Sequence, residues 1–272
     1  MVGVPIGVFD SGVGGLTVLR ALRALLPHEN FIYLGDTARL PYGTKSAESV
    51  VRYSIQAADA LIEREIKCLV VACNTASAVA LHALSERYAP LPVIGVLEPG
   101  AQAACAASVS GRIAVIATEG TVRGGAYQAA IHAIRPDARV VAQPCALFVA
   151  LAEEGWIEGA LVEGIVRRYL EPIFAADVAS HPDCLLLGCT HFPVLQPVMR
   201  RVLDPTIAIV DSAETTARTV RQLLDERRLA AGSASPGSLQ LLATDAPARF
   251  ARVGGTFFGS RIDESAVESV DL

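Results

Sequence analysis

The sequence lacks both a concentrated basic segment and a long apolar run. Its 23 lysine and arginine residues are scattered among 28 acidic ones, and the net charge is −5. Because nucleic-acid binding needs clustered basic residues, we expect no nucleic acid as the main partner. No uninterrupted apolar stretch approaches the roughly 18 residues of a membrane span. No basic residue precedes Arg20, so a signal peptide is not indicated, and we expect a cytoplasmic protein that does not enter a membrane.

Lysine is scarce, which restricts the cofactors that the chain could use. The only lysines are Lys45 and Lys67. A pyridoxal phosphate enzyme needs a Schiff-base lysine, but Lys67 precedes a predicted strand, at the edge opposite a ligand, and no phosphate-binding pattern surrounds Lys45. The glycine-rich run at 10–15 does not match the complete nucleotide-binding patterns. We therefore expect chemistry without an organic cofactor.

The six cysteines do not form the pattern of a disulfide framework. Several lie inside apolar, strand-like runs, which is typical of reduced thiols in a reducing compartment. A cysteine in such a run is most often a small buried hydrophobe. We expect this of Cys68, Cys105, Cys145 and Cys184. We expect no four-thiolate metal site, because strand positions five apart face opposite sides and zinc ligand pairs are usually closer in sequence.

Two related segments organise the chain. Residues 68–75 read CLVVACNT, and residues 184–191 read CLLLGCTH. Each has an apolar run typical of a strand buried on both faces, followed by cysteine, polar groups and a helix-like segment. Cys73 and Cys189 are therefore predicted at the carboxyl ends of parallel strands, the edge where open sheets bind ligands. The chain thus offers two thiols to one ligand.

Strand-like and helix-like segments alternate along the sequence, which favours an α/β protein with largely parallel sheets. A chain of 272 residues is long enough for two domains. We predict two similar α/β domains related by pseudo-two-fold symmetry, with the active site in the cleft between them. One comprises residues 1–97 and 212–272, and the other comprises residues 98–211. We expect a breaker of regular structure at 98–100, where the chain leaves the first domain, and a loosely held tail at 261–272.

Paired thiols suit the inversion of an α-carbon. Removing the α-proton of an amino acid requires a strong, positioned base and groups that accommodate the developing charge. Inversion also requires a second group that returns a proton to the opposite face. A thiolate and a thiol of similar pKa meet this need in both directions. A free thiol titrates near about 8.5, and cationic neighbours lower that value.

Four motifs in sequence order resemble the glutamate racemases of bacteria. They are DSGVGGLTV at 10–18, GDTARLPYG at 35–43, VVACNTASA at 70–78 and LLGCTHFPVL at 186–195. Together they span most of the chain, and four separated motifs are far more specific than one. His191 favours the glutamate enzymes over the related aspartate racemases, which more often have glutamate at this place. The resemblance implies cofactor-independent interconversion of L- and D-glutamate, which supplies D-glutamate for peptidoglycan.

The resemblance also implies catalytic roles for individual residues. Cys73 would act on D-glutamate with help from Asp10. Cys189 would act on L-glutamate with help from Glu153 and His191. Each half of the chain would thus contribute one thiol together with the polar partners of that thiol.

Further residues are implied less directly. Glu154 is the neighbouring alternative to Glu153, and Asp36 is another candidate for assisting catalysis. The implied substrate contacts are Asp10, Ser11, Tyr42, Gly43, Asn74, Thr75, Thr121, Thr190 and His191, with Thr118 near the ligand.

Alternatives stay open from the sequence alone. The same chemistry could serve aspartate or another small amino acid, which a comparison of turnover on glutamate and aspartate would decide. A third hypothesis is a non-catalytic role, since some glutamate racemases are reported to inhibit DNA gyrase and a two-domain cleft could also be a simple binding module; a supercoiling assay with and without the protein would discriminate. Members of the family associate in different ways, and a homodimer is one expected form.

Overall fold

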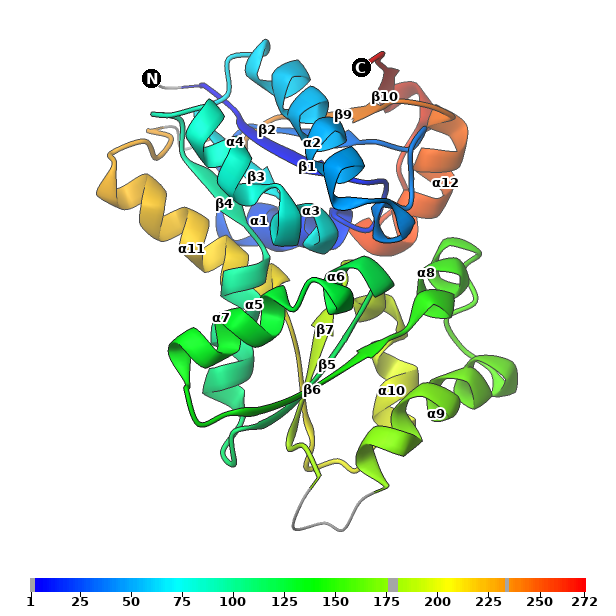
Figure 1. Ribbon diagram of the computed structural model, residues 1–272. Coiled ribbons are helices and arrows are strands. Elements are labelled where there is room, and N and C mark those ends of the chain that lie inside the picture. Colours follow the sequence, from blue (N-terminus) through cyan, green and yellow to red (C-terminus); the bar gives the residue numbers. More distant parts are fainter. Residues whose placement is uncertain (1–2, 176–180, 233–234) are drawn as a thin grey trace.

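The computed structural model describes residues 3–175, 181–232 and 235–272. Within these ranges the strands form two β-sheets, and every strand pairing is parallel. Helices cover both faces of each sheet (Figure 1). The predicted α/β fold with parallel sheets is confirmed. None of the helices in these ranges is long and apolar enough to cross a membrane.

The larger sheet has the strand order β10-β9-β2-β1-β3-β4. Its strands come from both ends of the chain: β1 (Ile6–Asp10), β2 (Phe31–Gly35), β3 (Cys68–Val71), β4 (Val93–Gly95), β9 (Leu239–Ala243) and β10 (Val267–Ser269). One face packs on α1 (Leu16–Leu25), α11 (Ala213–Glu226) and α12 (Pro247–Phe258). The other face packs on α2 (Ala47–Ile62), α3 (Asn74–Val79) and α4 (Leu81–Arg87).

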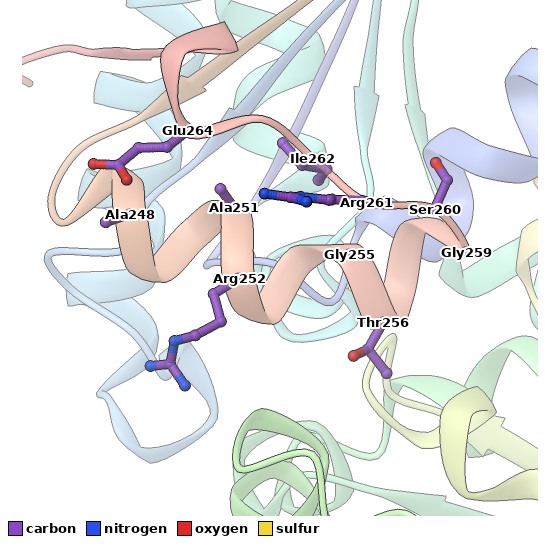
Figure 2. A pocket seen from close by; sticks show the side chains of 10 residues that line it. All are labelled: Ala248, Ala251, Arg252, Gly255, Thr256, Gly259, Ser260, Arg261, Ile262 and Glu264. Atoms are coloured by element: carbon purple, nitrogen blue, oxygen red, sulfur yellow. The ribbon is translucent and has the colours of Figure 1, made fainter.

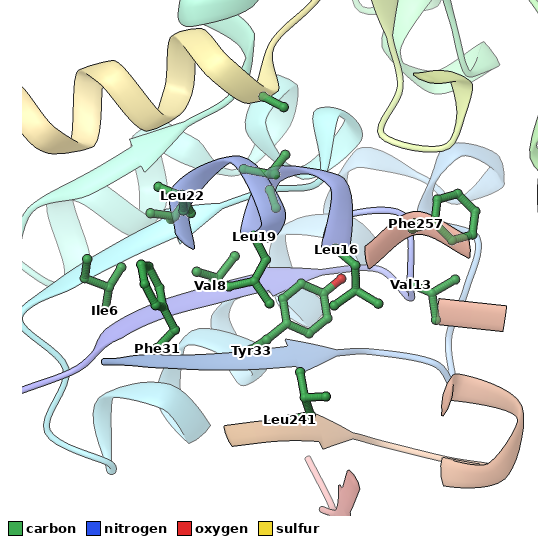
Figure 3. Packing of buried hydrophobic residues seen from close by; sticks show 14 of the residues in the cluster. Ile6, Val8, Val13, Leu16, Leu19, Leu22, Phe31, Tyr33, Leu241 and Phe257 are labelled. Carbon is green, nitrogen blue, oxygen red and sulfur yellow. The ribbon is translucent and has the colours of Figure 1, made fainter. Parts of the chain in front are cut away.

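The central strands of this sheet are buried on both faces, as their continuous apolar runs predict. Side chains alternate between the faces, so Val8 packs in the core below α1 while Phe9 packs in the core below α2. Figure 3 shows the first of these cores, in which Leu19 of α1 lies over Val8 and Tyr33. The sheet thereby holds the ends of β1 and β3 rigidly.

The smaller sheet has the order β6-β5-β7-β8. Its strands are β5 (Arg112–Ala117), β6 (Arg139–Pro144), β7 (Cys184–Gly188) and β8 (Ala208–Asp211). One face packs on α8 (Ala146–Glu153), α9 (Ala160–Phe174) and α10 (Gln196–Val202). The other packs on α5 (Leu97–Ala107) and α7 (Ala126–Ile134), and the short α6 (Glu119–Arg123) follows β5.

The two sheets repeat one strand order. In the larger sheet β2-β1-β3-β4 lie side by side, and in the smaller sheet β6-β5-β7-β8 do the same. The two cysteine strands, β3 and β7, therefore hold equivalent places, each beside the first strand of its unit. In the larger sheet β2 lies on one side of β1 and β3 on the other, and in the smaller sheet β6 and β7 flank β5 in the same way. Such a switch point is where open α/β sheets bind ligands.

The stretch at 98–100 does not interrupt regular structure, so the expected breaker is wrong. It lies in the first turn of α5, which begins at Leu97. Pro99 is tolerated there because the N–H groups of the first turn have no partner within the helix. The chain passes at this point from β4 of the larger sheet to α5 on the smaller one. The exact domain boundaries stay a prediction.

The acidic end of the chain is not a loose tail, so this expectation is also wrong. Within 261–272, β10 (Val267–Ser269) pairs with β9, and the side chains of Ile262 and Val267 are buried in the core of Figure 3. Because β10 is an edge strand, a few inward apolar side chains suffice, and Glu268 faces solvent. Composition alone did not reveal this pairing.

Candidate active site

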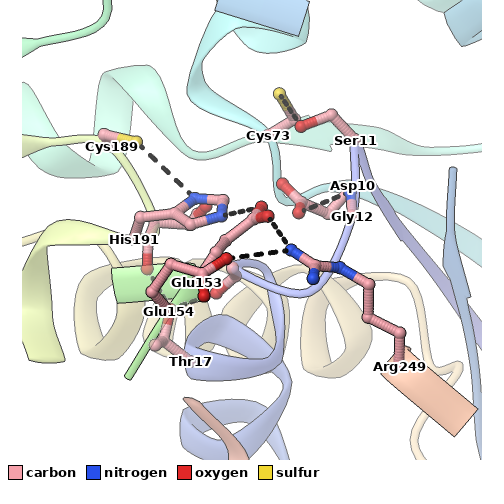
Figure 4. Close-up of polar contacts among 12 residues, drawn as sticks. Asp10, Ser11, Gly12, Thr17, Cys73, Glu153, Glu154, Cys189, His191 and Arg249 are labelled. Atoms are coloured by element: carbon pink, nitrogen blue, oxygen red, sulfur yellow. Dashed lines mark hydrogen bonds and ion pairs between the residues drawn. The ribbon is translucent and has the colours of Figure 1, made fainter. Parts of the chain in front are cut away.

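The carboxyl ends of four strands supply the candidate site, and Figure 4 shows residues at three of these ends, Asp10, Cys73 and Cys189. Asp10 is the last residue of β1, and Cys73 lies two residues beyond β3. Thr118 directly follows β5, and Cys189 directly follows β7. Because β1 pairs with β3 and β5 pairs with β7, each pair of ends lies at one sheet edge. The two edges meet, since a Cβ on Gly14 would lie 2.5 Å from Nδ1 of His191.

Cys73 is held as a buried thiol. It is 5% exposed, and its Sγ donates to Oγ of Ser11 at 3.7 Å. Burial and, secondly, the carboxylate of Asp10 raise the pKa of Cys73 to about 12. The charge of Cys189 acts in the same direction, which places the second thiol in the same electrostatic environment. Cys73 is therefore protonated at neutral pH in this closed form.

Asp10 is completely buried beside this thiol. Its Oδ2 accepts a hydrogen bond from the backbone N–H of Gly12 at 3.0 Å. Among the described residues, its Oδ1 has no partner. Burial raises the pKa of Asp10, and the charge of His191 together with backbone N–H groups offsets only part of this effect. The free oxygen is available to a proton or to a donor on a ligand.

Cys189 begins a chain of three polar side chains. Its Sγ lies 3.9 Å from Nδ1 of His191, and Nε2 of His191 lies 3.1 Å from Oε1 of Glu153. We call this the Cys189–His191–Glu153 relay. Burial alone lowers the pKa of His191, but its contacts with Cys189 and Glu153 outweigh burial and raise that pKa to about 10. His191 is therefore an imidazolium at neutral pH.

The structure distinguishes the two neighbouring glutamates. Glu153 has a side chain only 10% exposed and contacts His191, whereas Glu154 is 61% exposed and lies 3.9 Å from Arg249. Arg249, on α12, also donates from Nη2 to Oε2 of Glu153 at 3.2 Å. Although burial raises the pKa of Glu153, His191 and Arg249 together hold it below its ordinary value. Sequence reasoning missed Arg249, because only the fold brings α12 against α8.

The loop at 36–44 approaches the site from the larger sheet. Tyr42 and Gly43 lie in its 3₁₀ turn, and the hydroxyl of Tyr42 donates to Oδ2 of Asp36 at 2.5 Å. Asp36 also accepts from Arg39 at 2.7 Å, so it anchors the loop and does not contact either thiol in this form. A Cβ on Gly43 would lie 2.5 Å from Cβ of Thr118. Glycine therefore lets this loop pack against the smaller half.

Three threonines from both halves share hydrogen bonds. Oγ1 of Thr75 lies 3.0 Å from Oγ1 of Thr118 and 3.2 Å from Oγ1 of Thr121. Thr118 and Thr121 lie 3.1 Å apart in the same way. All three predicted residues are thus brought together. Oγ1 of Thr118 also accepts from the backbone N–H of Thr121 at 3.4 Å, whereas the hydroxyls of Thr75 and Thr121 can turn toward a ligand at little cost.

Asn74 presents a buried donor to the site. Its Oδ1 accepts from the hydroxyl of Tyr127 at 2.5 Å, which orients the amide. Its Nδ2 is buried without a partner among the described residues. An unpaired buried donor is costly unless a ligand completes it. Tyr127 was not predicted, since nothing in its sequence surroundings distinguishes it from a core tyrosine.

Thr190 lies where the glycine-rich turn meets the second cysteine segment. Its carbonyl accepts from Oγ1 of Thr17 at 3.3 Å, and a Cβ on Gly14 would lie 2.5 Å from its Oγ1. Together with His191, Thr190 is therefore clamped against residues of the larger half. Of the predicted site residues, Asp36 and Glu154 do not contact either thiol.

The site is closed in this form. Cys189 is 6% exposed and Cys73 is 5% exposed, so a ligand reaches them only when the surrounding elements separate. A cavity of about 100 Å³ reaches the rim of the relay, where it is lined by Val13, Leu40, Glu153, Asp245 and Arg249 among others. The other four cysteines are free thiols, with Cys68, Cys145 and Cys184 buried as predicted and Cys105 only partly so.

Known proteins show close similarity to this chain. A family model described as Asp/Glu/Hydantoin racemase matches residues 16–220. A glutamate racemase of Geobacter metallireducens is 49% identical over 259 residues, which cover 95% of this chain and 94% of the relative.

Solved structures agree along the whole chain. A glutamate racemase isoform from Bacillus anthracis superposes with a TM-score of 0.93 at 35% identity, covering 100% of this chain and 99% of the other. A glutamate racemase from Francisella tularensis, solved in complex with D-glutamate, has a TM-score of 0.90 at 35% identity, with coverages of 99% and 98%.

Proposed function

This chain belongs to the glutamate racemases of the Asp/Glu/hydantoin racemase family, and we propose that Cys73 and Cys189 are the two groups that exchange the α-proton of glutamate. The observation that carries the proposal is their equivalent placement after β3 and β7, each with its own polar partners. A reaction that removes a proton from one face and returns one to the other needs two such groups.

In the L to D direction, Cys189 acts as a thiolate and takes the α-proton. Cys73, a thiol in the closed form, donates its proton to the opposite face. The reaction leaves Cys189 as a thiol and Cys73 as a thiolate, which is the form that accepts D-glutamate. Return to the first form requires proton exchange with solvent or the reverse reaction. Charge is conserved at each transfer.

The polar partners favour each thiol's task. An imidazolium beside a cysteine stabilises its thiolate, and His191 has this position next to Cys189. Asp10 lies beside Cys73, where its unpaired Oδ1 can hold a proton or bind the α-ammonium of the substrate. That ammonium would counter the negative charge that now raises the pKa of Cys73. Substrate binding thus prepares the thiol that must become a thiolate.

Substrate carboxylates have donors in two places. We propose that one of them accepts from the unpaired Nδ2 of Asn74, whose amide is held by Tyr127. The hydroxyls of Thr75 and Thr121 can exchange their mutual hydrogen bonds for bonds to a ligand. We propose that the hydroxyl of Thr190 donates from the other half. These donors support glutamate as the substrate that we propose.

Neither lysine supports a pyridoxal phosphate mechanism. Lys67 is buried and donates to Glu29 and to the carbonyl of Leu229, before the start of β3 and so at the opposite end of the strand from Cys73. Lys45 follows the loop turn that carries Tyr42. This placement supports our proposal that the reaction uses the chain's own groups.

The cellular setting is also a proposal. Six free thiols suit a reducing compartment, which supports action in the cytoplasm. There the product would be D-glutamate for peptidoglycan synthesis. The homodimer stays a prediction. Leu147, Trp156 and Leu161, near α8 and α9, have exposed apolar side chains. Sedimentation of variants at these positions would test whether a dimer buries this surface.

Isotope exchange tests the proposal. The protein is incubated separately with L- and D-glutamate in heavy water, and the α-proton signal and the optical rotation are followed. We expect loss of the α-proton and convergence to the racemate from both enantiomers. No exchange from either enantiomer, at enzyme concentrations where a related racemase equilibrates the sample, would refute it.

A further inference from the structure

A charged side chain from α12 completes the relay on the Cys189 side. Arg249 donates to Oε2 of Glu153, while Oε1 of the same carboxylate contacts His191. The two oxygens are thus divided between one group on α12 and one group after β7. Figure 4 shows Arg249 reaching this carboxylate from the side opposite Cys189.

The contact joins parts of the chain that belong to different cores. The helix that carries Arg249 packs in the core of the larger sheet, and α8 packs mostly in that of the smaller sheet. Ala152, next to Glu153, lies in the larger core. The end of α8 therefore takes its position from both halves. Separation of the halves would therefore also break this contact.

We propose that Arg249 is a positioning residue for Cys189, which holds the Glu153 carboxylate against His191 only when the two halves are closed. The inference rests on the proposed racemisation and adds a condition to it. Proton transfer on the Cys189 side is enabled when α12 and α8 meet. Among the residues that the structure describes, Cys73 has no corresponding link to α12, and its neighbours are Ser11 and Asp10.

An ordinary surface ion pair is the alternative explanation. Such pairs contribute little, because solvent screens them, and the side chain of Arg249 is 46% exposed. Its partner, however, is only 10% exposed and also bonds His191, so freeing it leaves a buried carboxylate with one contact. The effect of Arg249 is therefore expected on geometry and protonation at Glu153 more than on global stability.

The charged groups around Glu153 fix the expected pH dependence. His191 and Arg249 are its cationic neighbours, Glu154 shares Arg249, and Asp245 lines the same small cavity. Removing Arg249 leaves the carboxylates of Glu153 and Glu154 without their shared cation. The acid limb of the kcat/KM profile is expected to move to higher pH, because Glu153 then protonates more easily.

The kinetic test compares Arg249→Met with Arg249→Lys and with Arg252→Met as a matched control. Arg252 lies one turn further along α12 and lines a separate surface groove (Figure 2). L- and D-glutamate have equal free energy, so any loss of kcat/KM must be the same in both directions. We expect kcat/KM to fall about tenfold in Arg249→Met, which is less than the loss of a general acid–base group causes. Arg249→Lys should restore most of this loss, and Arg252→Met should leave kcat/KM unchanged.

Isotope effects distinguish slower proton transfer by Cys189 alone from an effect on proton transfer by both thiols. If proton transfer by Cys189 becomes slower, the primary deuterium effect on kcat/KM rises with L-[2-²H]glutamate. It falls with D-[2-²H]glutamate, because transfer by Cys73 is then less rate-limiting. Equal movement of both effects, or an Arg249→Met variant that matches Arg252→Met, overturns the proposal.

A measurement without turnover separates this inference from the proposed function. In the free protein, the pKa of Glu153 is measured by carboxyl ¹³C NMR in the wild type, Arg249→Met and Arg252→Met. Arg249→Met is expected to raise this pKa, since the carboxylate loses a cation that holds it low, and Arg252→Met is expected to leave it unchanged. An unchanged pKa in Arg249→Met refutes the positioning role even if the wild-type protein racemises glutamate. Absence of racemisation by the wild type refutes the proposed function.

Discussion

Replacing Gly14 by alanine should separate the two thiol-bearing halves by a small and calculable amount. Gly14 lies in the turn after β1, and its missing side chain faces the segment that carries His191. A Cβ there would lie 2.5 Å from Nδ1 of His191 and 2.5 Å from Oγ1 of Thr190. Both atoms belong to the other half.

The size of the effect follows from these distances. Ordinary van der Waals contact for a Cβ begins near 3.4 Å, so the atoms must move apart by about 1 Å. A displacement of this size at a reacting centre can cost about 100-fold in rate. Forcing extra atoms into a packed site costs about 1–3 kcal/mol. We therefore expect kcat/KM to fall about 100-fold while the protein remains folded.

Gly12→Ala in the same turn is the matched control. Its Cβ would lie 3.4 Å from Cδ2 of Leu40, which is an acceptable contact, and it keeps the N–H that bonds Asp10. Polarimetry measures the activity of both variants, and thermal unfolding measures their stability. If Gly14→Ala retains activity close to that of Gly12→Ala, the closed junction is not the catalytic form and the reasoning fails.

Three further predictions follow from the site. Cys73→Ala and Cys189→Ala should each reduce racemisation by at least about 100-fold; full activity in either variant, measured by polarimetry, would exclude the two-thiol mechanism. Tyr127→Phe should raise KM roughly fivefold with little change in kcat, because a lost hydrogen bond of about 1 kcal/mol leaves the Asn74 amide unoriented; an unchanged KM would contradict that role. Because the pKa of His191 is raised to about 10 in the folded state, above its ordinary 6.5, its stabilising contribution is complete below about pH 6.5 and is lost as pH rises toward 10. Between about pH 6.5 and 10, the free energy of unfolding measured in urea should fall less for His191→Gln than for the wild type. An equal fall in both proteins would refute the raised pKa.

The sequence predicted the parts of the fold that depend on local pattern. The apolar runs before Cys73 and Cys189 indicated buried parallel strands, because only strands covered on both faces are apolar at every position. Four ordered motifs then predicted the site residues. The stretch at 98–100 was misinterpreted because proline and glycine also fit the first turn of a helix.

Contacts between distant segments could not be predicted. Arg249 and Tyr127 act through partners far away in the chain, and a single arginine or tyrosine gives no signal of such a partner. The pairing of the acidic C-terminal segment with β9 likewise depends on an available sheet edge. Patterns of neighbouring residues contain no information about which edge is free.

The most direct test of the two-thiol mechanism is the distribution of deuterium at early times in heavy water, starting from L-glutamate. Two separate groups predict that D-glutamate is deuterated from its first formation, while the remaining L-glutamate keeps its α-proton. A single group that serves both faces would instead return the original proton to part of the product, or label substrate and product together. That result would contradict a mechanism in which Cys73 and Cys189 act on opposite faces of one carbon.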